Sequence, residues 1–226
     1  MPKINLLPKN VAELIAAGEV VERPASVMKE LIENSIDAGA TEITAEIQRG
    51  GITYMRITDN GCGIERSDVP TAFLRHATSK IKTDRDLDCI GTLGFRGEAL
   101  AAVSSVAKVE MLTRTENSNV GTHYVIEGSE EKAQEDAGCP KGTTIIIRDI
   151  FFNTPARMKF LKKDVSEGNA VSQVVERIAL SHPEIAFKFI RDGKTVLNTS
   201  GDGNLKNTVY AVLGREFSNS LIEVND

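Results

Sequence analysis

The sequence predicts a mixed α/β fold. Amphipathic segments with apolar residues at three- and four-residue spacing, typical of helices, interchange with short runs that alternate apolar and polar residues, typical of strands. Two pairs of these strand-like runs are joined by glycine-containing turns and predict hairpins. With 226 residues, 41% of them hydrophobic, the chain can bury one substantial core, or one core and a small appendage.

Two helices are expected first. Residues 9–18 have helix-like apolar spacing, and Gly18 is a plausible stop. A second helix follows Pro24, with Ser26 as the candidate N-cap. Gly39 stands where a left-handed residue commonly ends a helix.

The remaining elements alternate along the chain. The first hairpin is expected to join residues 41–47 and 52–60, and the second covers 185–200 and turns at Asp192 and Gly193. Other strands are expected at 109–115, 122–128 and 143–150, helices at 68–75, 97–106, 171–180 and 205–213, and a polar loop at 77–88. The cluster SGDGN at 200–204 is the best linker, which predicts one domain over 1–203 and the truncated start of a second over 204–226.

Composition narrows the function classes. With 32 acidic and 27 basic residues, the chain is not expected to coat nucleic acid over its whole surface, so any DNA contact must be regional. Three separated cysteines predict neither a disulfide framework nor a zinc site. No stretch resembles a signal peptide or a membrane span, which predicts a cytoplasmic protein. The apolar run at the end of the sequence is typical of a fragment of a longer chain.

The stretch KELIENSIDAGAT places Glu30, Glu33, Asn34 and Asp37 on the face of the second helix opposite its apolar residues. Such a face is ordinarily just solvated. Glu30 and Asn34, however, are four residues apart, so a carboxylate that takes a proton from water and an amide oxygen that ligates a cation could meet one ligand. The spacing permits a Mg-nucleotide site.

The stretch DNGCGI places Asp59 at the end of a strand, followed by Gly61 and Gly63. Glycines leave backbone space for a flat ligand, and the carboxylate can accept from an exocyclic amine. A tight turn between strands is the alternative, because Asn-Gly favours one by itself.

The stretch GTLGFRGEAL places Gly91, Gly94 and Gly97 directly before an apolar helix. Free N–H groups and the positive end of a helix would face an anion there, and Arg96 and Lys80 could add side-chain charge. The alternative is a flexible glycine loop that caps a core helix. The polar run KTDRDLD upstream would suit a mobile lid.

Two other features do not predict sites. Gly193, Lys194 and Thr195 spell the end of a P-loop, but Lys188 stands where its first glycine would be. The three histidines are scattered without a pairing that predicts zinc or a His-based nucleophilic site.

Taken together, ELIENSIDAGA, DNGCGI and LGFRGEAL resemble the ATP site of the GHKL superfamily, which includes DNA gyrase B, Hsp90 and histidine kinases. The longer stretches GEVVERPASVMKELIENSIDAGAT, RHATSKI, LGFRGEALAAVSSV and GTTIIIRDIFFNTPARMKFLK resemble the N-terminal ATPase region of the MutL family of DNA mismatch repair proteins. A gyrase B type subunit is disfavoured, since that family lacks NTPAR and RHATSKI as written here.

The resemblance implies a two-layer α/β sandwich with a mixed sheet that hydrolyses ATP with Mg²⁺. Glu30 matches the general base, Asn34 the Mg²⁺ ligand, and Asp59 the residue that binds the adenine amine. Gly63 and Thr143 match residues that support the adenine base. Gly94, Phe95, Arg96 and Gly97 match the lid and phosphate-binding turn, and Lys80 lies in the segment next to the lid.

The resemblance also implies partners: a mismatch-recognition protein, DNA, and a second copy of the chain held in an ATP-dependent homodimer to which residues 1–23 contribute. A lysine of the family's second domain, expected beyond this sequence, reaches the γ-phosphate. The chain could therefore act instead as a nucleotide-gated interaction module with negligible turnover. The basic cluster Arg157, Lys159, Lys162 and Lys163 could contact DNA phosphates or form a solvated face.

Overall fold

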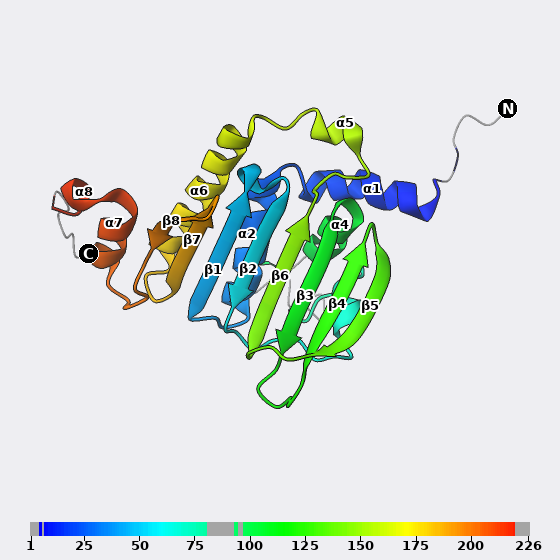
Figure 1. Ribbon diagram of the computed structural model, residues 1–226, viewed down its shortest axis with the longest axis horizontal. Coiled ribbons are helices and arrows are strands. Elements are labelled where there is room, and N and C mark those ends of the chain that lie inside the picture. Colours follow the sequence, from blue (N-terminus) through cyan, green and yellow to red (C-terminus); the bar gives the residue numbers. More distant parts are fainter. Residues whose placement is uncertain (1–4, 6, 81–92, 95–96, 220–226) are drawn as a thin grey trace.

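The computed structural model describes residues 5, 7–80, 93–94 and 97–219 of the chain. At its centre lies an eight-stranded sheet in the order β5-β4-β3-β6-β2-β1-β7-β8 (Figure 1). The strands are β1 Glu42–Gln48, β2 Tyr54–Asp59, β3 Lys108–Arg114, β4 Gly121–Glu127, β5 Glu130–Ala137, β6 Gly142–Arg148, β7 Ala186–Arg191 and β8 Lys194–Asn198. β1 and β7 pair in parallel and the other neighbours are antiparallel, so the sheet is mixed.

Helices form the second layer. They are α1 Lys9–Val20, α2 Pro24–Asp37, α3 Val69–Ala72, α4 Ala99–Val106, α5 Pro155–Met158, α6 Asp164–Ser181, α7 Leu205–Leu213 and α8 Arg215–Asn219, with a 3-10 turn at Arg49–Gly51. α2, α4 and α6 pack on one face of the sheet, and α1 packs on α4 (Figure 1). The predicted two-layer α/β sandwich is confirmed.

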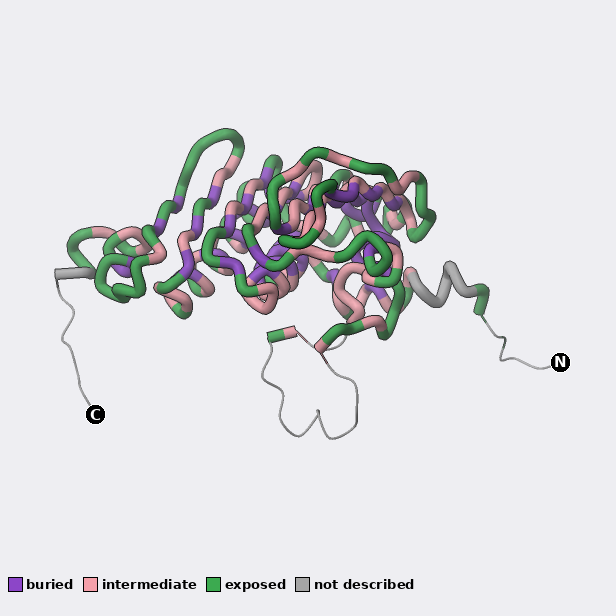
Figure 2. Tube along the Cα trace, turned by 90° about the horizontal axis from the view of Figure 1, so that it is seen from below, coloured by how far each residue is buried: buried purple, intermediate pink, exposed green. Residues whose placement is uncertain are grey.

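The core lies between these layers, as the alternating patterns require. Ile43, Ala45 and Ile47 of β1 point inward, and every second residue of the neighbouring strands does the same. From α2, the apolar side that includes Met28 and Leu31 meets them, and both side chains are at most 1% exposed. Buried residues accordingly concentrate in the middle of the molecule, with exposed residues around its margins (Figure 2).

The predicted stop at Gly18 is wrong, since α1 continues to Val20. Gly18 lies inside the helix, where a Cβ atom would collide with the guanidinium of Arg157. That guanidinium donates to the carbonyl oxygens of Leu14 (2.6 Å) and Ile15 (3.3 Å). A glycine there permits a close contact between distant segments, although glycine disfavours a helix interior.

The predicted N-cap of the second helix is also wrong. α2 begins at Pro24, two residues before Ser26, because proline has its φ angle preset for the first helical position. At the other end the prediction is confirmed, since Gly39 follows the helix with a φ of 72°.

Strand β5 was absent from the sequence predictions. Its sequence, EEKAQEDA, is almost entirely polar and mostly exposed, and it forms the sheet edge by pairing with β4 alone. An edge strand can carry charged side chains on both faces, so it lacks the period-two apolar pattern by which strands are recognised.

Two other helices differ from the predictions in their bounds. The helix expected at 68–75 is the single turn α3, and the one expected at 171–180 is the C-terminal part of the longer α6. Both hairpins and the helix at 205–213 are confirmed. None of the described helices combines the length and the apolar character that a membrane crossing requires.

Candidate nucleotide site

Helix α2 links the three motifs that the sequence singles out. Ser35 contacts Asp59 at the end of β2, Asn34 contacts Lys80, and Asp37 contacts Gly94 of the glycine-rich stretch. The residues that touch these motifs occupy one turn of the helix. One rigid element therefore positions both ends of the site.

At one end, three donors surround the carboxylate of Asp59. Oδ1 accepts from the backbone N–H of Gly61 (2.9 Å) and of Thr143 (3.2 Å), and Oδ2 accepts from the hydroxyl of Ser35 (2.9 Å). Burial is the largest influence on this group and raises the pKa of Asp59 above its ordinary value, although the three hydrogen bonds oppose it. The donors fix the orientation of a partly buried acceptor that an exocyclic amine could use.

Thr143 contacts this carboxylate, and Gly63 lies in the turn that follows Asp59. The hydroxyl of Thr143 is 3.1 Å from that of Thr113, which in turn accepts from the N–H of Ile64 (2.9 Å). Gly63 has a φ of 72°, and a Cβ atom there would collide with the carbonyl of Arg114. Gly63 therefore allows the DNGCGI turn to pack directly against the end of β3.

The second end contains a small network of charges. The Lys80 ammonium donates to Oδ1 of Asn34 (2.9 Å) and to Oδ2 of Asp37 (2.6 Å). The backbone N–H of Leu93 and that of Gly94 also donate to Asp37, each at 3.1 Å. Lys80 and Gly94 thus lie against α2, as a shared phosphate site would require.

Asn34 is suited to a divalent cation. Its amide oxygen already accepts from a positive group, the Lys80 ammonium, and neutral oxygen donors are ligands that Mg²⁺ uses together with phosphate oxygens. The residue therefore fits the Mg²⁺ that the fold family implies.

Glu30 lies one turn before Asn34 on α2. Its side chain is 36% exposed, so water can reach it, and the Lys29 ammonium stays 3.9 Å away because Lys29 pairs more closely with Glu33, at 2.7 Å. A partly exposed carboxylate on the same face as Asn34 can take a proton from a water molecule.

Gly97 occupies a tight position before α4. Its φ is 59°, and a Cβ atom there would lie 2.5 Å from the carbonyl oxygen of Ala77, so only glycine fits without strain. The predictions for Phe95 and Arg96 lie outside the described residues.

Three participants were missed as site residues. Ser35 and Thr113 complete the network around Asp59, and Asp37 gathers the donors at the other end. Asp37 was on the charged face of the helix pattern, but only its contacts distinguish it from Glu33. Nothing in the local sequence marks Ser35 or Thr113.

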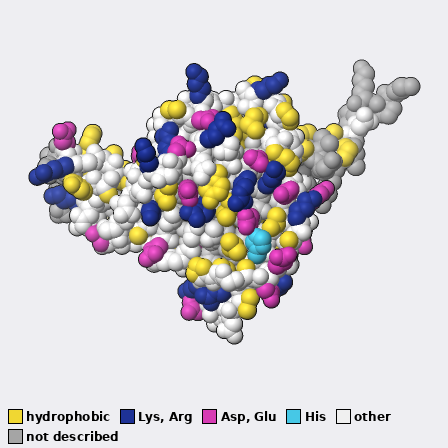
Figure 3. Space-filling view, in the orientation of Figure 1, with side chains coloured by type: hydrophobic (Ala, Val, Ile, Leu, Met, Phe, Trp, Pro, Cys, Tyr) yellow, Lys and Arg dark blue, Asp and Glu magenta, His cyan; other side chains and the backbone are white. Residues whose placement is uncertain are grey.

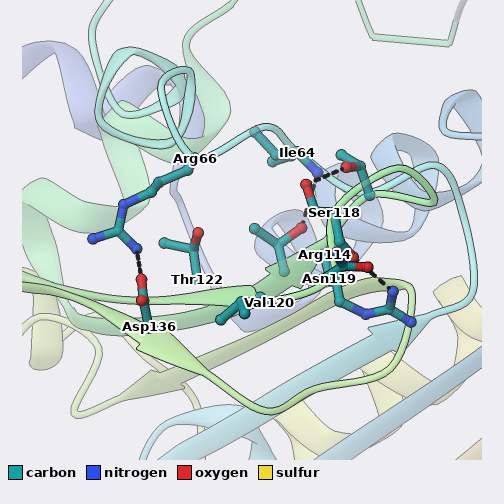
Figure 4. Close-up of a pocket in the computed structure, with 11 residues that line it drawn as sticks. Ile64, Arg66, Arg114, Ser118, Asn119, Val120, Thr122 and Asp136 are labelled. Carbon is teal, nitrogen blue, oxygen red and sulfur yellow. Dashed lines mark hydrogen bonds and ion pairs between the residues drawn. The ribbon is translucent and has the colours of Figure 1, made fainter.

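A hollow of about 300 Å³ adjoins the Asp59 network (Figure 4). Ile64 and Thr113 line it, and an ion pair between Arg66 and Asp136 crosses one side. Thr113 is thus shared between this hollow and the network around Asp59.

Charge on the molecular surface is mixed. Lys and Arg side chains are interspersed with Asp and Glu over the face in Figure 3. On the sheet, Arg56 pairs with Glu46 (2.6 Å) and Arg148 with Glu110 (2.8 Å). In the basic cluster, the guanidinium of Arg157 donates to the carbonyl oxygen of Leu14 in α1. Lys159, Lys162 and Lys163 are exposed.

Comparisons with known proteins agree with this geometry. The family of histidine kinase-, DNA gyrase B- and HSP90-like ATPases matches residues 22–146, more than half of the chain. A DNA mismatch repair protein MutL from Agathobacter rectalis is 57% identical over 224 residues, which cover 99% of this chain and 35% of that protein. MutL from Caldanaerobacter subterraneus subsp. tengcongensis is 51% identical, with 98% and 38% covered. The chain spans little more than a third of the length of these relatives.

Solved structures show the same likeness. The Aquifex aeolicus MutL ATPase domain complexed with ADP superimposes with a TM-score of 0.72 at 32% identity, covering 86% of this chain and 70% of that one. A second structure of that ATPase domain gives a TM-score of 0.67 at 30% identity, with 84% and 65% covered. The chain therefore belongs to the family of histidine kinase-, DNA gyrase B- and HSP90-like ATPases, and within it resembles the ATPase region of MutL proteins.

Proposed function

We propose that this chain binds ATP with Mg²⁺ and hydrolyses it, and that the ATP cycle switches contacts made during DNA mismatch repair. The observation that carries the proposal is the position of α2. One helix turn contacts a fixed, partly buried acceptor, Asp59, at one end and the network of Lys80, Asn34 and Asp37 at the other. A ligand that fits both ends has an amine-bearing base and an anionic tail, as ATP does.

In this proposal Asp59 accepts from the adenine amine, with Gly63 and Thr143 supporting the base. Lys80 and the turn of Gly94, Phe95, Arg96 and Gly97 bind the phosphates. Asn34 would help hold Mg²⁺, which neutralises charge on the phosphates.

Glu30 takes a proton from a water molecule whose oxygen attacks the γ-phosphorus. As that bond forms, the bond from the γ-phosphorus to the bridging oxygen breaks, and ADP and inorganic phosphate result. The partly exposed position of Glu30, on the same face as Asn34, supports this role.

A calorimetric titration with a non-hydrolysable ATP analogue, with and without Mg²⁺, tests the proposal. Saturable, Mg²⁺-assisted binding that Asp59→Asn abolishes is expected, because an amide would present a donor as well as an acceptor to the adenine. Asp68→Asn removes an exposed carboxylate and serves as the matched control. No binding by the wild-type chain would contradict the proposal.

The wider activity is proposed from the relatives, whose names place them in mismatch repair. ATP-dependent homodimerisation, contacts with a mismatch-recognition protein and DNA, and a cytoplasmic location belong to this proposal. So does a second domain starting at residue 204. Analytical ultracentrifugation with and without the ATP analogue tests the dimer.

The alternative, a nucleotide-gated module with negligible turnover, shares the binding prediction. Phosphate release separates the two: dimerisation with the analogue but no measurable release from ATP would favour the module.

A further inference from the structure

Asp37, the last residue of α2, accepts more hydrogen bonds than the proposed chemistry requires of it. Its side chain is only 8% exposed. Its carboxylate takes a bond from the Lys80 ammonium and one each from the backbone N–H groups of Leu93 and Gly94. The donors come from two segments separated by twelve residues in the sequence, so Asp37 joins both to the same helix end.

The groups meet within a few ångströms of Asn34. A Cβ atom built on Gly94 would lie 3.2 Å from Nζ of Lys80, 3.5 Å from Oδ1 of Asn34 and 3.8 Å from Oδ2 of Asp37. Gly94 is therefore packed into the centre of the cluster. A Cβ atom at position 94 would require the Lys80 ammonium to shift slightly.

The carboxylate stays ionised in this environment. Burial alone would raise the pKa of Asp37, but hydrogen bonds from Lys80, Leu93 and Gly94 outweigh it and hold the pKa below its ordinary value. Lys80 balances the negative charge, and the N–H groups of Leu93 and Gly94 donate to the two oxygens. The charge is thus already paired with donors of this chain.

We propose that Asp37 is a positioning residue for the triphosphate: its carboxylate holds the Lys80 ammonium and the Leu93–Gly94 backbone against α2, beside Asn34. This inference rests on the proposed function and assigns a further residue to the same site. The donors to Asp37, which are Lys80, Leu93 and Gly94, differ from the donors to Asp59, which are Ser35, Gly61 and Thr143. Removal of the Asp37 carboxylate therefore affects recognition of the phosphates and spares recognition of the base.

Calorimetric titrations with two probes, a non-hydrolysable ATP analogue with Mg²⁺ and adenosine, separate these effects. Asp37→Asn is expected to weaken binding of the analogue roughly tenfold to a hundredfold, since hydrogen bonds to a charged group are lost, and to leave adenosine binding unchanged. Glu33→Gln neutralises a carboxylate of the same helix that pairs with Lys29, and both affinities should stay at the wild-type values.

The outcomes are distinct. Wild-type affinity of Asp37→Asn for the analogue, or an equal loss for both probes, overturns the inference and leaves the proposed function standing. Failure of the wild-type chain to bind either probe overturns the proposed function and this inference with it.

If circular dichroism shows that Asp37→Asn does not fold, Asp37→Glu replaces it. This variant keeps the charge but moves the carboxylate by one methylene, so the three donors can no longer all reach it. Weaker analogue binding with unchanged adenosine binding supports the inference, and unchanged binding of both overturns it.

Discussion

At the scale of residues, the aspartates at the two ends of the site have pKa values shifted in opposite directions. Burial dominates at Asp59 and raises its pKa, whereas donors dominate at Asp37 and lower its pKa. As the pH falls, Asp59 therefore takes up its proton before Asp37 does. The base-binding end is expected to lose its charged acceptor first.

This difference predicts the pH dependence of binding. Adenosine affinity should decline as the pH falls through the raised pKa of Asp59, at a pH above the ordinary value of 3.8. For folding the sign is opposite, since the ionised buried carboxylate costs stability that the native state recovers on protonation. Titrations with adenosine at a series of pH values check this, and an affinity that is flat down to pH 3.8 would contradict it.

Glu30 gives a second prediction at this scale. Glu30→Gln should reduce phosphate release roughly a hundredfold to ten-thousandfold, because an amide cannot take the proton, while affinity for the ATP analogue stays unchanged. A phosphate-release assay beside calorimetry measures both quantities. Glu135→Gln, on the exposed edge strand β5, should keep wild-type turnover. Equal turnover of Glu30→Gln and the wild type would remove Glu30 from the role of base.

At the scale of elements, α2 serves the core and the site at once. Its apolar side packs Met28 and Leu31 beneath the sheet, and its polar side presents Glu30, Asn34 and Asp37. Its position against the sheet is therefore also the position of the site. A loss of packing between α2 and the sheet should therefore lower both the stability of the fold and the affinity of the site.

The core contribution can be measured with a pair of leucines. Leu31→Ala should lower the free energy of unfolding by about 2–5 kcal/mol, because the side chain is 1% exposed and leaves a cavity. Leu74→Ala removes the same atoms from a residue that is 58% exposed, and should change the free energy of unfolding by less than about 0.5 kcal/mol. Denaturant titrations of the two variants give the comparison, and equal losses would show that α2 does not carry the core as described.

At the scale of the whole molecule, charge limits where DNA can bind. The net charge is -5, and arginines on the sheet are paired with glutamates. The sequence predicts DNA contact at a basic cluster between α5 and α6, of which Lys159, Lys162 and Lys163 are exposed. Arg157 of this cluster instead donates to a carbonyl oxygen of α1.

The triple variant Lys159→Gln, Lys162→Gln, Lys163→Gln tests that assignment. It should weaken DNA binding and reduce the steepness of the salt dependence by about three, since each phosphate contact contributes ~0.9 to the slope. Fluorescence anisotropy over a range of salt concentrations measures the slope. A control variant replaces three exposed lysines elsewhere, Lys188, Lys194 and Lys206. An unchanged slope in the first variant would move DNA contact to another surface.

The sequence by itself determined the elements whose cause is local. The apolar period of α2, the left-handed Gly39 and the Asp192–Gly193 turn, with φ angles of 49° and 79°, depend only on neighbouring residues, and these predictions are confirmed. It also marked Asn34, Lys80 and Asp59 as candidates, because glycine spacing and helical periodicity are visible without a fold. Their catalytic and binding roles remain predictions.

Only the tertiary structure decided which distant groups meet. The parallel pairing of β1 with β7 joins strands more than a hundred residues apart, and β5 is a strand because β4 offers it a free edge. In the same way, Gly18 fits inside α1 because Arg157 approaches it, and Asp37 differs from Glu33 because Lys80 and Gly94 reach it. Hydrogen-bond partners and close approaches between distant residues are set by packing, which local preferences do not encode.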